Sequence, residues 1–144
     1  MKTQRQSIWA VDDNQPDLDI LKMVLEGVDV DVRTFTGANE LINVLQAAAK
    51  STLPDLVLLD VNMPGLSGID IVERLRSDPK LSGLRVCVLT GSQMPKEKVL
   101  LEALGAGCVL RKPHNVAEFE TLRANLKAVL GADPGRAMYA RDDA

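Results

Sequence analysis

Leu56-Val57-Leu58-Leu59-Asp60 is the stretch that decides the fold, because it joins an unbroken apolar run to a carboxylate. A strand buried on both faces has such a run, and both faces are buried when helices cover a parallel sheet. A second run, Ile8-Trp9-Ala10-Val11, leads into the pair Asp12-Asp13. The two runs predict neighbouring strands with acidic side chains at their carboxyl ends, the edge at which open α/β sheets bind ligands.

The rest of the chain alternates apolar runs with amphipathic segments. The expected strands cover residues 7–11, 30–34, 56–59, 85–89 and 108–110. The expected helices cover residues 16–26, 38–49, 68–77, 95–105 and 116–130. Thr36 or Asn39 is expected to cap the second helix. This alternation predicts an α/β fold, a doubly wound, flavodoxin-like (βα)5 arrangement with a five-stranded parallel sheet in the order 2-1-3-4-5.

Length and composition are those of a globular protein with one domain. The 144 residues are 46% hydrophobic and 26% charged, which is ordinary for a soluble domain. We expect a domain over residues 1–130 and a flexible tail, or the start of a linker, over residues 131–144. A net charge of −3 argues against a protein built mainly to bind nucleic acid. The polar start of the chain gives no sign of a signal peptide or membrane span, so a cytoplasmic location is expected.

The cysteines and the single histidine argue against soft-metal chemistry. Cys87 and Cys108 each lie inside an apolar run, which favours buried small side chains over a disulfide or a metal pair. With His114 as the one imidazole, a zinc site is not expected.

Polar residues of distinct chemistry stand at the ends of four strands that are consecutive in the predicted order. They are Asp12 and Asp13, Asp60, Thr90 and Lys112. Carboxylates that meet in one crevice repel each other unless a cation joins them, and a set of oxygen ligands suits Mg²⁺. A hydroxyl and an ammonium beside them would bind an anionic oxygen. The set favours phosphoryl transfer, with Asp60 as the carboxylate nucleophile.

Simpler interpretations exist for each of these residues. Asp13 and Asn14 would serve as helix caps, and Asp60 before a Pro-Gly turn would serve as a turn residue. Thr90 and Lys112 are unremarkable taken singly. Only their combination at successive strand ends favours a functional site.

Four motifs make the chain resemble a CheY-like receiver domain of a two-component response regulator. They are Val-Asp-Asp-Asn at 11–14, Leu-Leu-Asp-Val-Asn-Met-Pro-Gly-Leu-Ser-Gly at 58–68, Leu-Thr-Gly-Ser at 89–92 and Arg-Lys-Pro at 111–113. Each motif alone is weak, but all four occur in order and at family spacing, and the resemblance covers residues 7 to 130.

The resemblance implies a role for each matching residue. Asp60 is expected to be the phosphoacceptor. Asp13, Asp60 and the backbone carbonyl of Asn62 are expected to ligate Mg²⁺ directly, while Asp12 acts through water. Thr90 is expected to hydrogen-bond the phosphoryl group, and Lys112 to contact it as a cation.

The sequence departs from the family pattern at three positions near the site. Val109 stands where receivers often carry a tyrosine or phenylalanine, so a rotating aromatic ring is not available there. Gly91 follows Thr90 where a slightly larger residue is common. His114 replaces an aromatic or apolar residue. We expect the phosphoryl chemistry to survive these changes, while its coupling to output stays open.

The resemblance also implies partners. The phosphoryl donor would be a sensor histidine kinase or a histidine phosphotransfer protein. The output would be a protein bound at the surface formed by residues 95–105, the strand at 108–110 and the helix at 116–130, with no direct contact to nucleic acid and no membrane. A homodimer is left open. The domain is expected either to stand alone as a switch or to be part of a longer protein such as a hybrid kinase.

Three other classes are weaker. A haloacid-dehalogenase-type phosphatase also uses an aspartate nucleophile with Mg²⁺, but it needs an aspartate two positions further on, where this chain has Asn62. A DNA-binding regulator would need a basic reading helix. A phosphate-independent pseudo-receiver is disfavoured because no acid, hydroxyl or lysine of the set is missing. The chain is therefore expected to be a signalling switch rather than an enzyme that turns over an external substrate.

Overall fold

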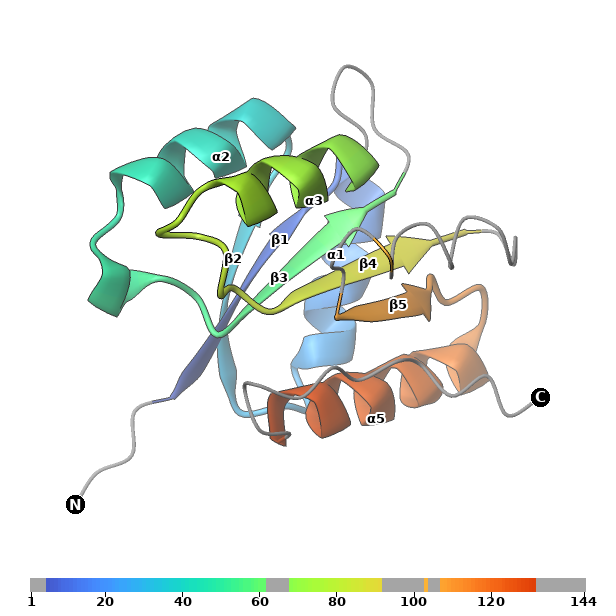
Figure 1. Ribbon diagram of the computed structural model, residues 1–144. Coiled ribbons are helices and arrows are strands. Elements are labelled where there is room, and N and C mark those ends of the chain that lie inside the picture. Colours follow the sequence, from blue (N-terminus) through green and yellow to red (C-terminus); the bar gives the residue numbers. More distant parts are fainter. Residues whose placement is uncertain (1–4, 62–67, 92–102, 104–106, 132–144) are drawn as a thin grey trace.

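A five-stranded parallel sheet with helices on both faces forms the fold of the computed structural model (Figure 1). The structure describes residues 5–61, 68–91, 103 and 107–131. The strands are β1 (Gln6–Val11), β2 (Val30–Phe35), β3 (Leu56–Asp60), β4 (Val86–Thr90) and β5 (Cys108–Arg111). The helices are α1 (Gln15–Leu25), α2 (Ala38–Ala47), the 3₁₀ turn η1 (Lys50–Thr52), α3 (Gly68–Ser77) and α5 (Val116–Gly131).

The strand order is β2-β1-β3-β4-β5, and every neighbouring pair is parallel. This order confirms the doubly wound arrangement expected from the sequence and places the polar–apolar alternating strand β2 at an edge. The expected helix over 95–105 lies outside the described residues apart from Ala103, and the tail from 132 onward lies outside them entirely.

Alternate residues of the central strands pack into two separate cores. Trp9, Val11, Val57 and Leu59 belong to the core under α2 and α3. Their chain neighbours, such as Ile8 and Leu58, belong to the core under α1 and α5 on the opposite face (Figure 1). Successive side chains of a strand point to opposite faces, so a run of apolar residues fills both cores at once. Burial of each large aliphatic side chain contributes about 1.5–3 kcal/mol.

The expected cap of α2 was wrong. Gly37 is the N-cap residue, with extended backbone angles (φ −135°, ψ 138°) and no side-chain hydrogen bond. Thr36 lies one residue too early to reach the first turn, and Asn39 already lies inside the helix. An N-cap residue needs a backbone that is not yet helical, and in this turn Gly37 alone occupies that place.

Cys87 and Cys108 are free, buried and directly opposite each other in the register of β4 and β5. Burial raises the pKa of the Cys87 thiol well above its usual value, and its hydrogen bond and charge interaction with Cys108 add to this effect. The expectation that both cysteines are small buried side chains is confirmed. Among the described helices, none is long and apolar enough to cross a membrane.

Candidate functional site

Strand register brings the acidic residues together at the carboxyl edge of the sheet. Val11 pairs with Leu59, so Asp12 comes level with Asp60, the last residue of β3. One carboxylate oxygen from each of Asp12, Asp13 and Asp60 lies within 4.8 Å of the others. Asp12 and Asp60 are each only 5% exposed, whereas Asp13 is exposed. Three converging carboxylates are the donor chemistry that a hard divalent cation requires, so these residues fit Mg²⁺.

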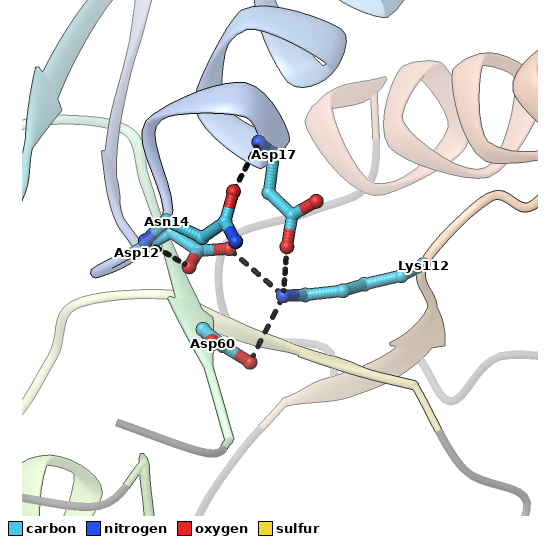
Figure 2. Close-up of polar contacts among 5 residues, drawn as sticks. All are labelled: Asp12, Asn14, Asp17, Asp60 and Lys112. Carbon is cyan, nitrogen blue, oxygen red and sulfur yellow. Dashed lines mark hydrogen bonds and ion pairs between the residues drawn. The ribbon is translucent and has the colours of Figure 1, made fainter. Parts of the chain in front are cut away.

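Lys112 reaches into this cluster from the end of β5. Its Nζ lies 2.9 Å from Oδ2 of Asp12, 2.9 Å from Oδ2 of Asp17 and 3.2 Å from Oδ1 of Asp60 (Figure 2). Its backbone N–H donates to the carbonyl of Thr90, at 2.8 Å, which fixes the start of the side chain beside β4. An ammonium has three donor hydrogens, and here three carboxylates surround it.

The surroundings of Lys112 keep its ammonium charged. Burial by itself lowers the pKa of Lys112, because it disfavours the charged form. The hydrogen bonds to Asp12 and Asp17 and the charge of Asp60 outweigh that effect, so the pKa of Lys112 lies above its ordinary value. The site therefore carries a permanent cation among its acids.

Asn14 caps the first helix and also orients the acids. Its side-chain carbonyl accepts a hydrogen bond from the backbone N–H of Asp17 (3.1 Å), and its own backbone N–H donates to Oδ1 of Asp12 (3.0 Å) (Figure 2). The capping interpretation thus holds for Asn14, while Asp13 contributes a carboxylate to the cluster. Capping and site chemistry belong to adjacent residues.

The remaining expected site residues divide into described and undescribed ones. Thr90 is the last residue of β4 and is 7% exposed. Val109 is buried in β5 opposite Val88, so no aromatic side chain stands at that position. Asn62 and its carbonyl lie outside the described residues.

His114 is exposed, and its backbone N–H donates to Oε1 of Glu118 at 2.7 Å, at the start of α5. Asn115 accepts from the backbone N–H of Glu118 at 2.9 Å. These bonds satisfy groups at the first turn of a helix. The part of residue 114 in these contacts is structural, as expected for a residue to which the sequence assigned no catalytic role.

Gly68 brings the start of α3 against the backbone of the site. Its N–H donates to the carbonyl of Val61 at 3.1 Å. A Cβ at this position would lie 2.9 Å from Cα of Val61 and 3.1 Å from the carbonyl oxygen of Asp60. Only a residue without a side chain allows this approach, so Gly68 helps to set the backbone that follows the predicted phosphoacceptor.

Asp17 is the contact that sequence reasoning missed. It lies in the first turn of α1, and its side chain is 39% exposed, yet it is as close to Lys112 as Asp12 is. The available signal was an acid placed one helical turn after Asp13, because the first turn of a helix that follows a strand lies over the edge of the sheet.

Comparison with known proteins agrees with this geometry. A family model described as the response regulator receiver domain matches residues 8–124. The DNA-binding response regulator MtrA of Mycolicibacterium smegmatis is 34% identical over 128 residues, which are 88% of this chain and 53% of MtrA. The chain thus spans about half the length of that curated relative. A DNA-binding relative gives no support to the expectation that nucleic acid is never contacted directly.

Two solved structures share the fold over nearly their whole length. The chemotaxis response regulator CheY4 of Vibrio cholerae superimposes with a TM-score of 0.75 and 28% identity, covering 88% of this chain and 99% of CheY4. The phosphorylated cyanobacterial phytochrome response regulator RcpA gives a TM-score of 0.76 and 25% identity, covering 86% of this chain and 92% of RcpA. With its sheet order, its acidic cluster and the family match, this chain belongs to the response regulator receiver domain family of two-component systems.

Proposed function

We propose that Asp60 accepts a phosphoryl group from the phosphohistidine of a sensor histidine kinase or a phosphotransfer protein. The observation that carries the proposal is the position of Asp60, which is buried between two further carboxylates and the ammonium of Lys112. A carboxylate in such a place is both a nucleophile and a metal ligand. The family membership of the chain supports the same role.

The chemistry follows from the charges around Asp60. A carboxylate oxygen of Asp60 forms a bond to phosphorus while the bond from phosphorus to the donor nitrogen breaks. The departing imidazole keeps the electron pair of that bond and takes up a proton from solvent. Lys112 neutralises part of the charge on the phosphoryl oxygens, and its raised pKa keeps it protonated throughout.

The acidic cluster would hold Mg²⁺ through Asp12, Asp13 and Asp60, together with the carbonyl of Asn62 expected from the family pattern. When bound, the cation would supply charge neutralisation at the phosphoryl oxygens and allow the carboxylates to remain close together. The protein residues position it and prevent their own mutual repulsion from opening the edge of the sheet.

Phosphorylation is proposed to act as a switch rather than as one step of a turnover cycle on an external substrate. It adds about −1.5 to −2 charges and new acceptor oxygens. Thr90, at the end of β4, would turn its hydroxyl toward them and shift the residues that follow. A two-state domain then changes the surface formed by residues 95–105, β5 and α5, where a partner protein in the cytoplasm would bind.

Intact mass after incubation with acetyl phosphate and Mg²⁺ tests the proposal. The wild type should gain one phosphoryl group, and the gain should vanish without Mg²⁺ and in Asp60→Asn. Asp19→Asn is the matched control, because Asp19 is an exposed acid on α1 that bonds Gln15 and not Lys112. A wild type that gains nothing, under conditions in which the adduct is long-lived, would indicate a pseudo-receiver. Steady hydrolysis of a small phosphate ester would instead indicate a phosphatase.

A further inference from the structure

Asp17 differs from the other two partners of Lys112 in one respect: it is not part of the three-carboxylate cluster. Asp12 and Asp60 each have a second task in the proposed chemistry, since they face the cation or carry the phosphoryl group. Asp17 has no such task. It is therefore the one carboxylate of the three whose contact with Lys112 does not have to change when the site is loaded.

The carboxylate of Asp17 is itself held in place. It lies in the first turn of α1, and its backbone N–H is bonded to the Asn14 side chain at 3.1 Å. The N-terminal end of a helix favours a negative charge. Asn14 in turn donates to Asp12 at 3.0 Å, so Asp17 and Asp12 approach Lys112 from one connected turn (Figure 2).

Few other partners are available to the ammonium on this side of the site. A small cavity of about 30 Å³ lies beside Lys112, between α1 and the ends of the strands. Asp12 and Asp17 are the carboxylates on its wall, which is otherwise made mainly of apolar side chains such as Ile20 and Leu89. If Asp17 lost its charge, Lys112 would have only the two cluster acids left among these groups.

We infer that Asp17 is a positioning residue that holds the Lys112 ammonium at the phosphoryl site while Asp12 and Asp60 are engaged by the cation and the phosphoryl group. The inference rests on the proposed function of Asp60. Asp17 does not touch the reacting atoms. It acts through Lys112, whose hydrogen bond to Asp17 (2.9 Å) is as short as its bond to Asp12.

The decisive variants are Asp17→Asn, which removes the charge and keeps the size, and Asp17→Glu, which restores the charge. Asp19→Asn removes an equal charge from the same helix without touching Lys112. For each protein we would measure the rate of phosphoryl gain from acetyl phosphate by intact mass. Calorimetric Mg²⁺ affinity and the free energy of unfolding in urea, measured in parallel, separate positioning from metal binding and from structure.

We expect Asp17→Asn to slow phosphoryl gain about fivefold, the effect of losing one partly exposed charged hydrogen bond, and Asp19→Asn to slow it by less than about twofold. Asp17→Glu should recover most of the rate. The Mg²⁺ affinity of Asp17→Asn should match that of Asp19→Asn, because neither residue belongs to the cluster.

The inference is overturned if Asp17→Asn reacts as fast as Asp19→Asn, or if Asp17→Glu stays as slow as Asp17→Asn. A rate that falls only in proportion to a loss of stability or of Mg²⁺ affinity also overturns it. These results leave the proposed function intact, because the wild type still reacts. A wild type that takes up no phosphoryl group removes the proposed function itself, and the role of Asp17 with it.

Discussion

The ammonium of Lys112 lies 3.2 Å from Oδ1 of Asp60, the carboxylate predicted to be phosphorylated. Both side chains are mostly buried, at 18% and 7% exposure, so their attraction is screened less by solvent than that of a surface pair. The cation therefore stabilises the acidic cluster before any phosphoryl group arrives. The same cation would meet the phosphoryl oxygens afterwards.

Removing Asp13 should stabilise the metal-free protein. Its carboxylate oxygen lies within 4.8 Å of those of Asp12 and Asp60, and Asp13→Asn relieves that repulsion by up to about 1 kcal/mol. Urea unfolding in EDTA measures the gain. Mg²⁺ at ten times its Kd should then stabilise the wild type by about 1.4 kcal/mol and the variant much less. A variant that is less stable than the wild type in EDTA would contradict the repulsion argument.

Gly68→Ala should destabilise the fold and slow phosphoryl gain together. The new Cβ would lie 2.9 Å from Cα of Val61 and 3.1 Å from the carbonyl oxygen of Asp60, so backbone has to move. We expect a loss of about 1–3 kcal/mol in unfolding free energy. Gly83→Ala is the control, because no atom lies within 4 Å of a Cβ there. Equal stability of the two variants would show that the approach at Gly68 is not tight.

Thr90→Ala should separate phosphorylation from output. Thr90 is buried at the end of β4, and its carbonyl, which the substitution retains, holds the backbone of Lys112. The variant should still gain a phosphoryl group, but the change in amide hydrogen exchange of β5 and α5 on phosphorylation should disappear. Thr90→Ser keeps the hydroxyl and should retain the change. If Thr90→Ala responds like the wild type, the hydroxyl does not transmit the signal.

The buried thiol of Cys87 should make the fold less stable at alkaline pH. Its pKa is raised in the native state, whereas an unfolded cysteine ionises near about pH 8.5. Between those two values the unfolded chain has released a proton that the native chain still holds. Stability should therefore fall as pH rises above about 8.5, by up to about 1.4 kcal/mol for each pH unit.

Urea unfolding from pH 7.5 to 10 measures this fall, with Cys87→Ala as the reference that lacks the thiol. The difference in unfolding free energy between the two proteins should shrink as pH rises if the wild type is the more stable one. Parallel pH profiles would mean that the thiol ionises as easily in the native protein as in the unfolded chain.

Apolar runs predicted the strands well because each run reports burial that the whole sheet imposes. The run 56–59 predicted β3, and the structure extends that strand to include Asp60. The expected end of α1 was close to the observed one for a similar reason, since Leu18 and Leu21 mark its buried face. Burial on both faces leaves a signal in the order of residues.

Contacts between side chains leave a weaker signal. The sequence predicted that Asp12, Asp60 and Lys112 share one site, because each follows a strand of known place in the order. It did not predict Asp17, whose contact with Lys112 joins residues 95 positions apart and depends on how one helical turn sits over the sheet. The cap of α2 failed for the same kind of reason, since it depended on the backbone angles of Gly37.

The hydrogen bond from Lys112 to Asp12 joins residues 100 positions apart. During synthesis the acids of β1 and β3 therefore leave the ribosome well before their cation does. A nascent chain that lacks β5 has three mutually repelling carboxylates and no ammonium to oppose them, so it is a poor phosphoryl acceptor. Competence for signalling then begins only when the last strand has docked, which makes the site a check on the completeness of the whole domain.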